Sequence, residues 1–308
     1  FIELNFNYDY VIKVYFLVKK SIMNILILGS KGFLGEALKK YFIFKNFFVL
    51  GLDKKGNSNR NNLKANINKF DIKKIVKHNN INLIIDAIGY SGHNLQKRKF
   101  LTRSLRENLE DKSKLINDLS KINTKILYVS FGTLYKYGNK NKIKKQYFGL
   151  TNNSKEAQTQ IKFKYEEKLI RIKNKNLRIL TINVGSVYGN RKKLKKLDKN
   201  IIDIILQNIK NKIKMDLYLT NNRRVKNIID INSLSNEVYK IITYNYEVQK
   251  RKYKEVNIDK YLFDLVKLKK FKNLNFVNSE NKDNLNYYYV GKPKNIGFKK
   301  FINSIEYK

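Results

Sequence analysis

The sequence predicts an α/β fold built on a doubly wound parallel sheet, and the order of its apolar and amphipathic segments is the reason. Short apolar runs that suit strands buried on both faces occur at 24–28, 47–52, 81–88, 125–130 and 177–184. Helical patterns lie between them at about 36–42, 72–78, 105–121 and 156–173. Strands that alternate with helices at this spacing imply right-handed crossovers and one parallel sheet.

The regular alternation ends near Gly189, and only helices near 200–212 and 233–244 are recognisable beyond it. We therefore expect residues 23–190 to form a nucleotide-binding domain and 191–308 to form a smaller C-terminal α+β substrate-binding lobe. About 223–245 is expected to return to the main sheet. Residues 1–22 precede Met23 and the first strand, and they are interpreted as an N-terminal extension outside the core.

Composition excludes several classes of site. The 308 residues include no cysteine and two histidines, His78 and His93, so disulfides and thiolate metal sites are impossible and a metal centre is not expected. No stretch reaches the ~20 apolar residues that span a bilayer. Residues 1–22 have no small-residue cleavage site after their apolar run. These features favour a cytoplasmic protein with no membrane partner.

The charge balance is strongly basic, with 65 Lys and Arg against 25 Asp and Glu, a formal net charge of +40. Clustered basic residues bind polyanions by releasing counterions. Here the basic residues are spread along the whole chain, and the abundance of Lys, Asn, Ile and Tyr is typical of AT-rich coding. We expect nucleic-acid binding only as non-specific electrostatic adhesion, and a polyanion-binding protein on this scaffold is the third functional alternative.

The strongest motif is the glycine-rich turn Gly29-Ser-Lys-Gly32-Phe-Leu-Gly35 between the first strand and its helix. The first glycine permits the tight turn, the second lets the backbone approach a pyrophosphate, and the third lets helix and strand pack closely. Asp53 ends the second strand, where it can bond a ribose 2′-hydroxyl. This is a Rossmann-type dinucleotide site that favours NAD; NADP is the less favoured cofactor, which the adjacent Lys54 and Lys55 could accommodate.

Further motifs follow in order: Ile85-Asp-Ala-Ile-Gly89, Tyr128-Val-Ser-Phe-Gly-Thr-Leu-Tyr135, Asn183-Val-Gly-Ser-Val-Tyr-Gly-Asn190 and Arg223-Arg-Val-Lys-Asn-Ile-Ile-Asp-Ile-Asn. With the glycine turn, they make residues 23 to at least 242 resemble the NAD-dependent epimerase/dehydratase family of the extended short-chain dehydrogenase/reductase superfamily. The resemblance implies a homodimer that acts on a nucleotide sugar through a 4-keto intermediate. It implies these cofactor-binding residues: Gly29, Lys31, Gly32, Phe33, Leu34, Gly35, Asp53, Asn66, Ile67, Ala87, Ile88, Gly89, Asn108 and Lys162.

The family's reaction uses a tyrosine and a lysine four residues apart on one helix, because the lysine lowers the tyrosine pKa. Lys162 and Glu166 fit the lysine and the acidic residue that follows it, but Gln158 stands in the tyrosine position. The register Thr151 to Lys155 also lacks the tyrosine. Three readings stay open: Tyr165 or Tyr135 acts as the acid, the protein binds without turnover, or this helix is misaligned.

The remaining candidates are hydroxyl donors and substrate contacts. Thr133 or Ser130 would bond the reacting oxygen, although such residues after a strand are also common turn formers. His93, Ser186 and Arg224 are the expected substrate-binding residues. His93 could equally be a satisfied loop histidine, and Arg223 and Arg224 could either clamp a diphosphate or lie in solvent.

Overall fold

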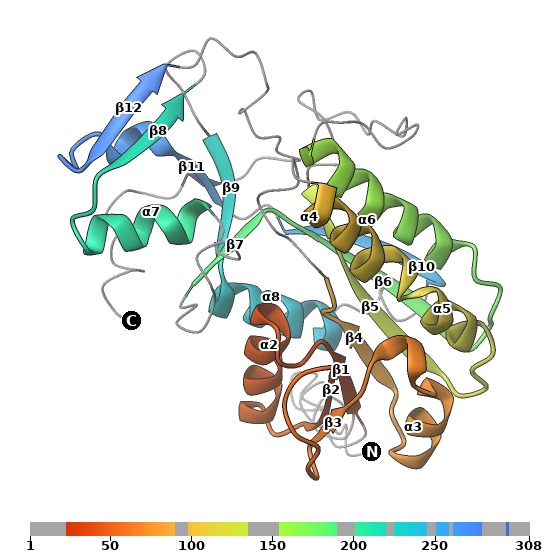
Figure 1. Cartoon of the computed structure of the whole chain (residues 1–308). Coiled ribbons are helices and arrows are strands. Elements are labelled where there is room, and N and C mark those ends of the chain that lie inside the picture. Colours follow the sequence, from red (N-terminus) through yellow and green to blue (C-terminus); the bar gives the residue numbers. More distant parts are fainter. Residues whose placement is uncertain are drawn as a thin grey trace, which may run out of the picture.

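The main element of the fold is a seven-stranded sheet in the order β10-β6-β5-β4-β1-β2-β3, in which every pair is parallel (Figure 1). The computed structural model describes residues 23–89, 98–134, 154–189, 201–219, 225–244, 251–258, 261–278 and 294–295. The strands are β1 (Asn24–Leu28), β2 (Phe48–Asp53), β3 (Asn62–Lys64), β4 (Leu83–Asp86), β5 (Ile126–Thr133), β6 (Leu177–Val184) and β10 (Tyr253–Ile258). The predicted doubly wound parallel sheet is confirmed.

Helices cover both faces of this sheet, and each face has its own apolar core. One face carries α3 (Ile72–His78), α5 (Ser113–Ser120) and α6 (Ser154–Ile170). The other carries α2 (Phe33–Phe44) and α8 (Ile231–Tyr244), which pack side by side. Strands such as β1 and β4 are buried on both sides, which explains the continuous apolar residues at 25–28 and 83–85.

The connection from β4 to β5 is more broken than the sequence predicts. A single helix is expected over about 105–121. The structure has α4 (Arg98–Leu105), a π-helical turn η2 (Arg106–Glu110) and then α5. The wider turn places three consecutive residues, Glu107, Asn108 and Leu109, in buried positions, which a regular helix with one apolar stripe does not achieve.

The smaller lobe is α+β, as predicted. Its four-stranded sheet has the order β13-β11-β9-β7, and a separate pair joins β12 to β8. Its core gathers around Ile202, Ile205, Leu217 and Ile228. The elements are β7 (Ser186–Tyr188), α7 (Ile201–Lys210), β8 (Met215–Leu219), β9 (Val225–Asp230), β11 (Tyr261–Asp264), the 3₁₀ helix η5 (Leu265–Leu268), β12 (Leu274–Asn278) and β13 (Lys294–Asn295).

The expected return of 223–245 to the main sheet is wrong for its strand. β9 pairs with β7 and β11 in the smaller sheet, while α8 packs against a face of the main sheet. The strand that returns is β10, which pairs with β6 in parallel. The edge of β6 is therefore occupied by a segment later in the sequence. The division at residue 190 stays a prediction, and residues 1–22 lie outside the described residues.

Candidate functional site: a glycine turn and a buried ion-pair cluster

The glycine turn joins β1 to α2 at the carboxyl edge of the sheet. Gly29 has a φ of +75°, and a Cβ there would lie 3.0 Å from the Ala87 carbonyl and from the Ile88 nitrogen. At Gly35 a Cβ would lie 2.2 Å from the Gly29 oxygen. Both positions therefore require glycine, one for its conformation and one for the close approach of helix and turn.

Gly32 is the N-cap residue of α2 and, as a glycine, makes no side-chain capping hydrogen bond. The first turn of an α-helix carries amide groups without intrahelical acceptors and the positive end of the helix dipole. Because the cap position is a glycine, the backbone at this end is not covered by a side chain of its own. The arrangement is suited to an anion, as the sequence predicts.

Asp53 lies against this turn, as predicted from its place at the end of β2. Its Oδ2 accepts a hydrogen bond from the Lys31 nitrogen and its Oδ1 accepts one from the Lys55 nitrogen, each at 2.9 Å. The Leu52 carbonyl also accepts from the Gly29 nitrogen at 2.8 Å. The carboxylate is thus held at a fixed place between the two strand ends.

The side chain of Lys54, the next residue in the chain, reaches η2. Its Nζ lies 2.9 Å from Glu107 Oε1, which also accepts from Arg103 Nε at 3.1 Å. Burial tends to raise the pKa of Glu107, but the hydrogen bonds and charges of Lys54 and Arg103 outweigh it and lower that pKa. Lys54 is therefore engaged with a carboxylate on η2.

The predicted cofactor wall after β4 meets the predicted asparagine. A Cβ on Gly89 would lie 2.7 Å from Asn108 Oδ1, and Asn108 Nδ2 donates to Ser104 Oγ at 3.0 Å. Residue 66 follows Ala65, whose nitrogen donates to the Asp53 carbonyl at 2.9 Å.

Asn66 caps the 3₁₀ helix η1 (Ile67–Lys69), and the Ile67 side chain is buried in the apolar core. The structure thus brings most of the predicted cofactor residues to one edge. Ile67 has only its backbone to offer there.

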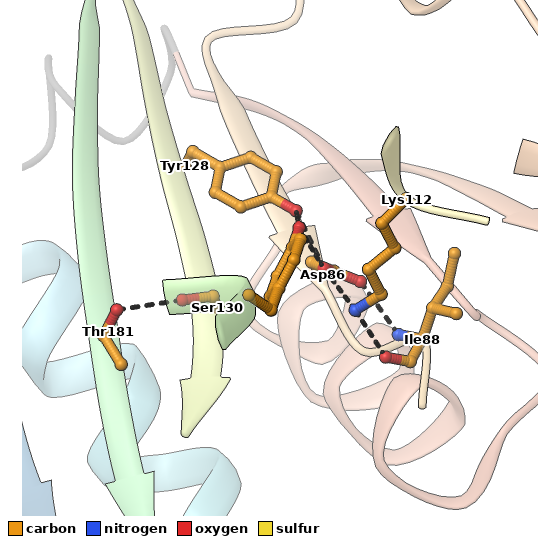
Figure 2. Close-up of polar contacts among 7 residues, drawn as sticks. Asp86, Ile88, Lys112, Tyr128, Ser130 and Thr181 are labelled. Carbon is orange, nitrogen blue, oxygen red and sulfur yellow. Dashed lines mark hydrogen bonds and ion pairs between the residues drawn. The ribbon is translucent and has the colours of Figure 1, made fainter. Parts of the chain in front are cut away.

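Next to this wall lies a buried polar group that the sequence does not reveal, which we call the Asp86 cluster: Asp86, Lys112, Tyr128 and Tyr165. Figure 2 labels the first three. Asp86 Oδ2 receives Lys112 Nζ at 2.7 Å, the Tyr128 hydroxyl at 2.8 Å and the Tyr165 hydroxyl at 3.0 Å. The two tyrosine hydroxyls lie 2.6 Å apart, and Lys112 Nζ lies 4.4 Å from the centre of the Tyr165 ring.

The signal that could have located this cluster is Asp86 itself. An aspartate at the end of a strand buried on both faces needs a cationic or hydrogen-bonding partner.

The environment of Tyr165 bears on its expected role as an acid. Burial raises the pKa of Tyr165 well above its ordinary value, and the negative charge of Asp86 raises it further. The pKa of Tyr128 is raised well above its ordinary value by the same two causes, followed by Tyr165 itself. Both phenols therefore keep their protons at neutral pH. Tyr165 is buried and its hydroxyl points into the cluster.

Lys162 lies one turn before Tyr165 on α6 and is partly buried. Burial lowers its pKa to about 8, and the charge of Lys112 contributes, while Glu166 opposes the shift. Glu166 is buried beside β5, since a Cβ on Gly132 would lie 2.2 Å from Glu166 Oε1. Lys162 and Glu166 are thus on the face of α6 that meets the sheet, as their assignment requires.

The hydroxyl candidates differ in their surroundings. Ser130 is buried, and its Oγ lies 3.0 Å from the Thr181 hydroxyl on β6. Thr133 is the last residue of β5, and Ser186 opens β7. His93, Arg224 and Tyr135 fall outside the described residues.

Two classes of site can be assessed for the part of the chain that is described. No group of three or more His, Asp or Glu side chains there is placed to hold a metal ion. None of its helices is long and apolar enough to cross a bilayer.

The fold and the glycine turn define a Rossmann-type nucleotide-binding protein. Residues 25–245 match the NAD dependent epimerase/dehydratase family, and the chain belongs to that family. A comparison with curated protein sequences finds no match.

Three solved structures illustrate what the fold is similar to. UDP-glucose 4-epimerase from Thermotoga maritima, with UDP-glucose, has a TM-score of 0.69 and 16% identity over 92% of this chain and 98% of that one. MoeE5 with UDP-glucose and NAD has a TM-score of 0.67 and 12% identity over 92% and 98%. UDP-glucuronic acid 4-epimerase from Bacillus cereus, with UDP-glucuronic acid and NAD, has a TM-score of 0.62 and 14% identity over 93% and 94%.

Proposed function

We propose that this protein is an NAD-dependent enzyme that modifies a nucleotide-linked sugar through a 4-keto intermediate. The observation that carries the proposal is the glycine turn, in which a helix end that begins at Gly32 and a fixed Asp53 lie together at the carboxyl edge of the sheet. Membership of the epimerase/dehydratase family supports the same assignment. Solved structures of similar fold contain UDP-sugars, which supports a nucleotide sugar as the substrate class.

The residues present fit NAD. The backbone around Gly32 and the start of α2 would hold the linked phosphates, and the Asp53 carboxylate would accept hydrogen bonds from the adenosine ribose. A 2′-phosphate is disfavoured because it would meet the Asp53 carboxylate, and Lys54 is already engaged with Glu107. Bound NAD would supply the hydride acceptor for oxidation of a sugar hydroxyl.

Among the predicted catalytic residues, the surroundings favour Lys162 and Thr133. Lys162 would hold the nicotinamide ribose. With a pKa of about 8, its amine is neutral in about a tenth of the molecules at pH 7 and in about half at pH 8, and the neutral form can accept a proton. Tyr165 is less suited to that step because its hydroxyl is enclosed in the Asp86 cluster. Thr133 would bond the reacting oxygen, since it is the last residue of β5 and lies closer than Ser130 to the carboxyl edge of the sheet.

The second candidate function is a protein that binds NAD and a nucleotide sugar without turnover. It is favoured by one specific observation: Gln158, which has no titratable proton, precedes Lys162 by four residues where the family's tyrosine belongs. The two candidates share the cofactor site and differ only in chemistry.

Calorimetric titration with NAD and with NADP tests the cofactor site first, and we expect saturable binding of NAD with the greater affinity. Incubation with NAD and a panel of UDP-sugars, followed by chromatographic separation of the sugars, then tests turnover. A Lys162→Met variant is the matched control, because it should abolish product while the protein remains folded. NAD binding without any product would favour the non-catalytic candidate, and a failure to bind either dinucleotide would refute both.

A further inference from the structure

Resting on the proposed cofactor site, we propose that the Asp86 cluster is a positioning device that fixes the backbone of Ile88 and thereby the spacing between the cofactor wall and the glycine turn. The chemistry proposed above uses none of its four side chains, since it favours Lys162 over Tyr165. Their role is to hold a piece of backbone that would contact the dinucleotide.

One ion pair holds both backbone polar groups of Ile88. Asp86 Oδ1 accepts from the Ile88 nitrogen at 3.0 Å, and Lys112 Nζ donates to the Ile88 carbonyl at 2.8 Å (Figure 2). Asp86 and Lys112 are in turn joined at 2.7 Å. The orientation of the residue is therefore set from both sides by partners that are themselves fixed to each other.

Ile88 lies directly against the glycine turn. The position that a Cβ would take on Gly29 is 3.0 Å from the Ile88 nitrogen and from the Ala87 carbonyl. The Ala87 nitrogen donates to the Leu28 carbonyl at 2.9 Å. A change in the backbone torsions of Ile88 would therefore alter the gap between the wall and the backbone that would hold the phosphates.

The cluster also joins the cofactor wall to α6, the helix that carries Lys162. The Tyr165 hydroxyl contacts Asp86, and Lys112 lies over the Tyr165 ring. Tyr128 adds a contact from β5. The cluster thus connects the end of β4, the start of α5, the strand β5 and the helix α6 at one point.

Stability alone does not explain why a charged pair, Asp86 and Lys112, is buried at this place. The side chains of Lys112 and Asp86 are 5% and 0% exposed, so both ions have lost their hydration. Well-packed apolar residues of similar volume often stabilise a protein as well as a buried ion pair does. Apolar side chains, however, could neither accept from the Ile88 nitrogen nor donate to its carbonyl. Positioning that residue is what the pair accomplishes and an apolar core does not.

The test compares a double variant, Asp86→Leu with Lys112→Met, with the wild-type protein. Removing both charges together avoids leaving one ion buried alone. We expect a thermal unfolding midpoint close to that of the wild type but at least about tenfold weaker NAD binding, as expected from the loss of two hydrogen bonds. UDP affinity, measured with UDP alone, should be unchanged, because a merely loosened protein would lose both affinities together.

The matched control is Lys114→Met with Asp118→Leu, which removes the 2.6 Å ion pair within α5. It should leave NAD affinity unaltered. Tyr165→Phe is the milder second variant, which keeps the ion pair and removes one hydroxyl; it should weaken NAD binding about threefold.

NAD affinity within twofold of the wild type in the double variant would overturn the inference. If the double variant does not fold, unchanged NAD affinity in Tyr165→Phe overturns it. Absence of NAD binding by the wild type would instead refute the proposed function, and this is measured before any variant.

Discussion

Replacing Gly32 with alanine should separate cofactor binding from stability. Gly32 has φ −75° and ψ 167°, an extended conformation that alanine adopts without strain. Its Cβ would lie 3.1 Å from the Gly29 oxygen, a tight contact that a small shift relieves. Alanine also restricts the unfolded chain, which stabilises by about 0.4–1 kcal/mol and offsets that contact. We expect the free energy of unfolding to change by less than about 1 kcal/mol.

The same methyl group would stand at the N-terminal end of α2, where the proposed site needs the phosphates to approach the backbone closely. NAD affinity should therefore fall at least about tenfold, which corresponds to about 1.4 kcal/mol. Gly32→Ala is expected to be a folded protein that no longer binds its cofactor well.

Gly35→Ala is the matched comparison, because its new methyl group would meet backbone atoms, which cannot move away as a flexible side chain can. The new Cβ would lie 2.2 Å from the Gly29 oxygen and 2.8 Å from its carbonyl carbon. Relief requires helix and turn to separate by roughly 1 Å, and overpacking of this kind costs about 1–3 kcal/mol. Stability and NAD affinity should fall together in this variant.

Urea unfolding followed by circular dichroism measures the stability, and calorimetric titration measures NAD affinity. Wild-type NAD affinity in Gly32→Ala would refute the placement of the phosphates at this helix end. Wild-type stability in Gly35→Ala would refute the close packing of turn and helix.

Three further predictions concern charge. The pKa of Lys162 is about 8 in the folded protein against 10.5 without burial, so the unfolded chain binds more protons between these pH values and stability should rise from pH 8 to 10.5. The Lys162→Met variant should lose this rise. In urea unfolding at pH 7 it should be more stable than the wild type by on the order of 2 kcal/mol, because it buries no charge at this position. The pKa of Glu107 is lowered below 4.5, so its contribution to the free energy of unfolding is complete above pH 4.5 and is lost as the pH falls through the lowered value. The Glu107→Gln variant should therefore show a flatter acid side of the stability profile. An unchanged profile would contradict the pairing with Lys54 and Arg103. Binding to RNA or DNA should disappear by about 0.15 M salt in a fluorescence anisotropy titration, and binding that persists there would favour the polyanion-binding alternative.

The sequence predicts best those strands and helices whose structure follows from the pattern of their own residues. The expected strands 24–28 and 177–184 and the helix 72–78 coincide with β1, β6 and α3, because each is a continuous apolar or amphipathic run. β3 has three residues and carries Asn and Lys, so it resembles the loop around it. The short strands of the smaller sheet are missed for the same reason, since their pairing is set by partners distant in the sequence.

The residues of the candidate site likewise include some that the sequence predicts and some that it does not. Asp53 is predictable because its distance from the glycine turn follows from one βα unit, and the structure places it 2.9 Å from the Lys31 nitrogen. Lys112 is not predictable, since its partner Asp86 lies 26 residues earlier on another element. Nothing in a local pattern distinguishes this lysine from the many solvated ones of a chain with a formal charge of +40.

The two candidate functions, catalysis and binding without turnover, differ in what they require of the side chains on α6. The family's reaction needs a group that exchanges a proton near neutral pH, and the two tyrosines that α6 and β5 bring together have a raised pKa and donate into the Asp86 cluster. Lys112 in that cluster contributes, after burial, to the lowered pKa of Lys162. An active enzyme of this design should therefore lose turnover as the pH falls through about 8, because protonation removes the acceptor on Lys162. NAD binding alone should persist well below that pH, so the pH dependence of turnover measured against that of binding distinguishes catalysis by Lys162 from binding without chemistry.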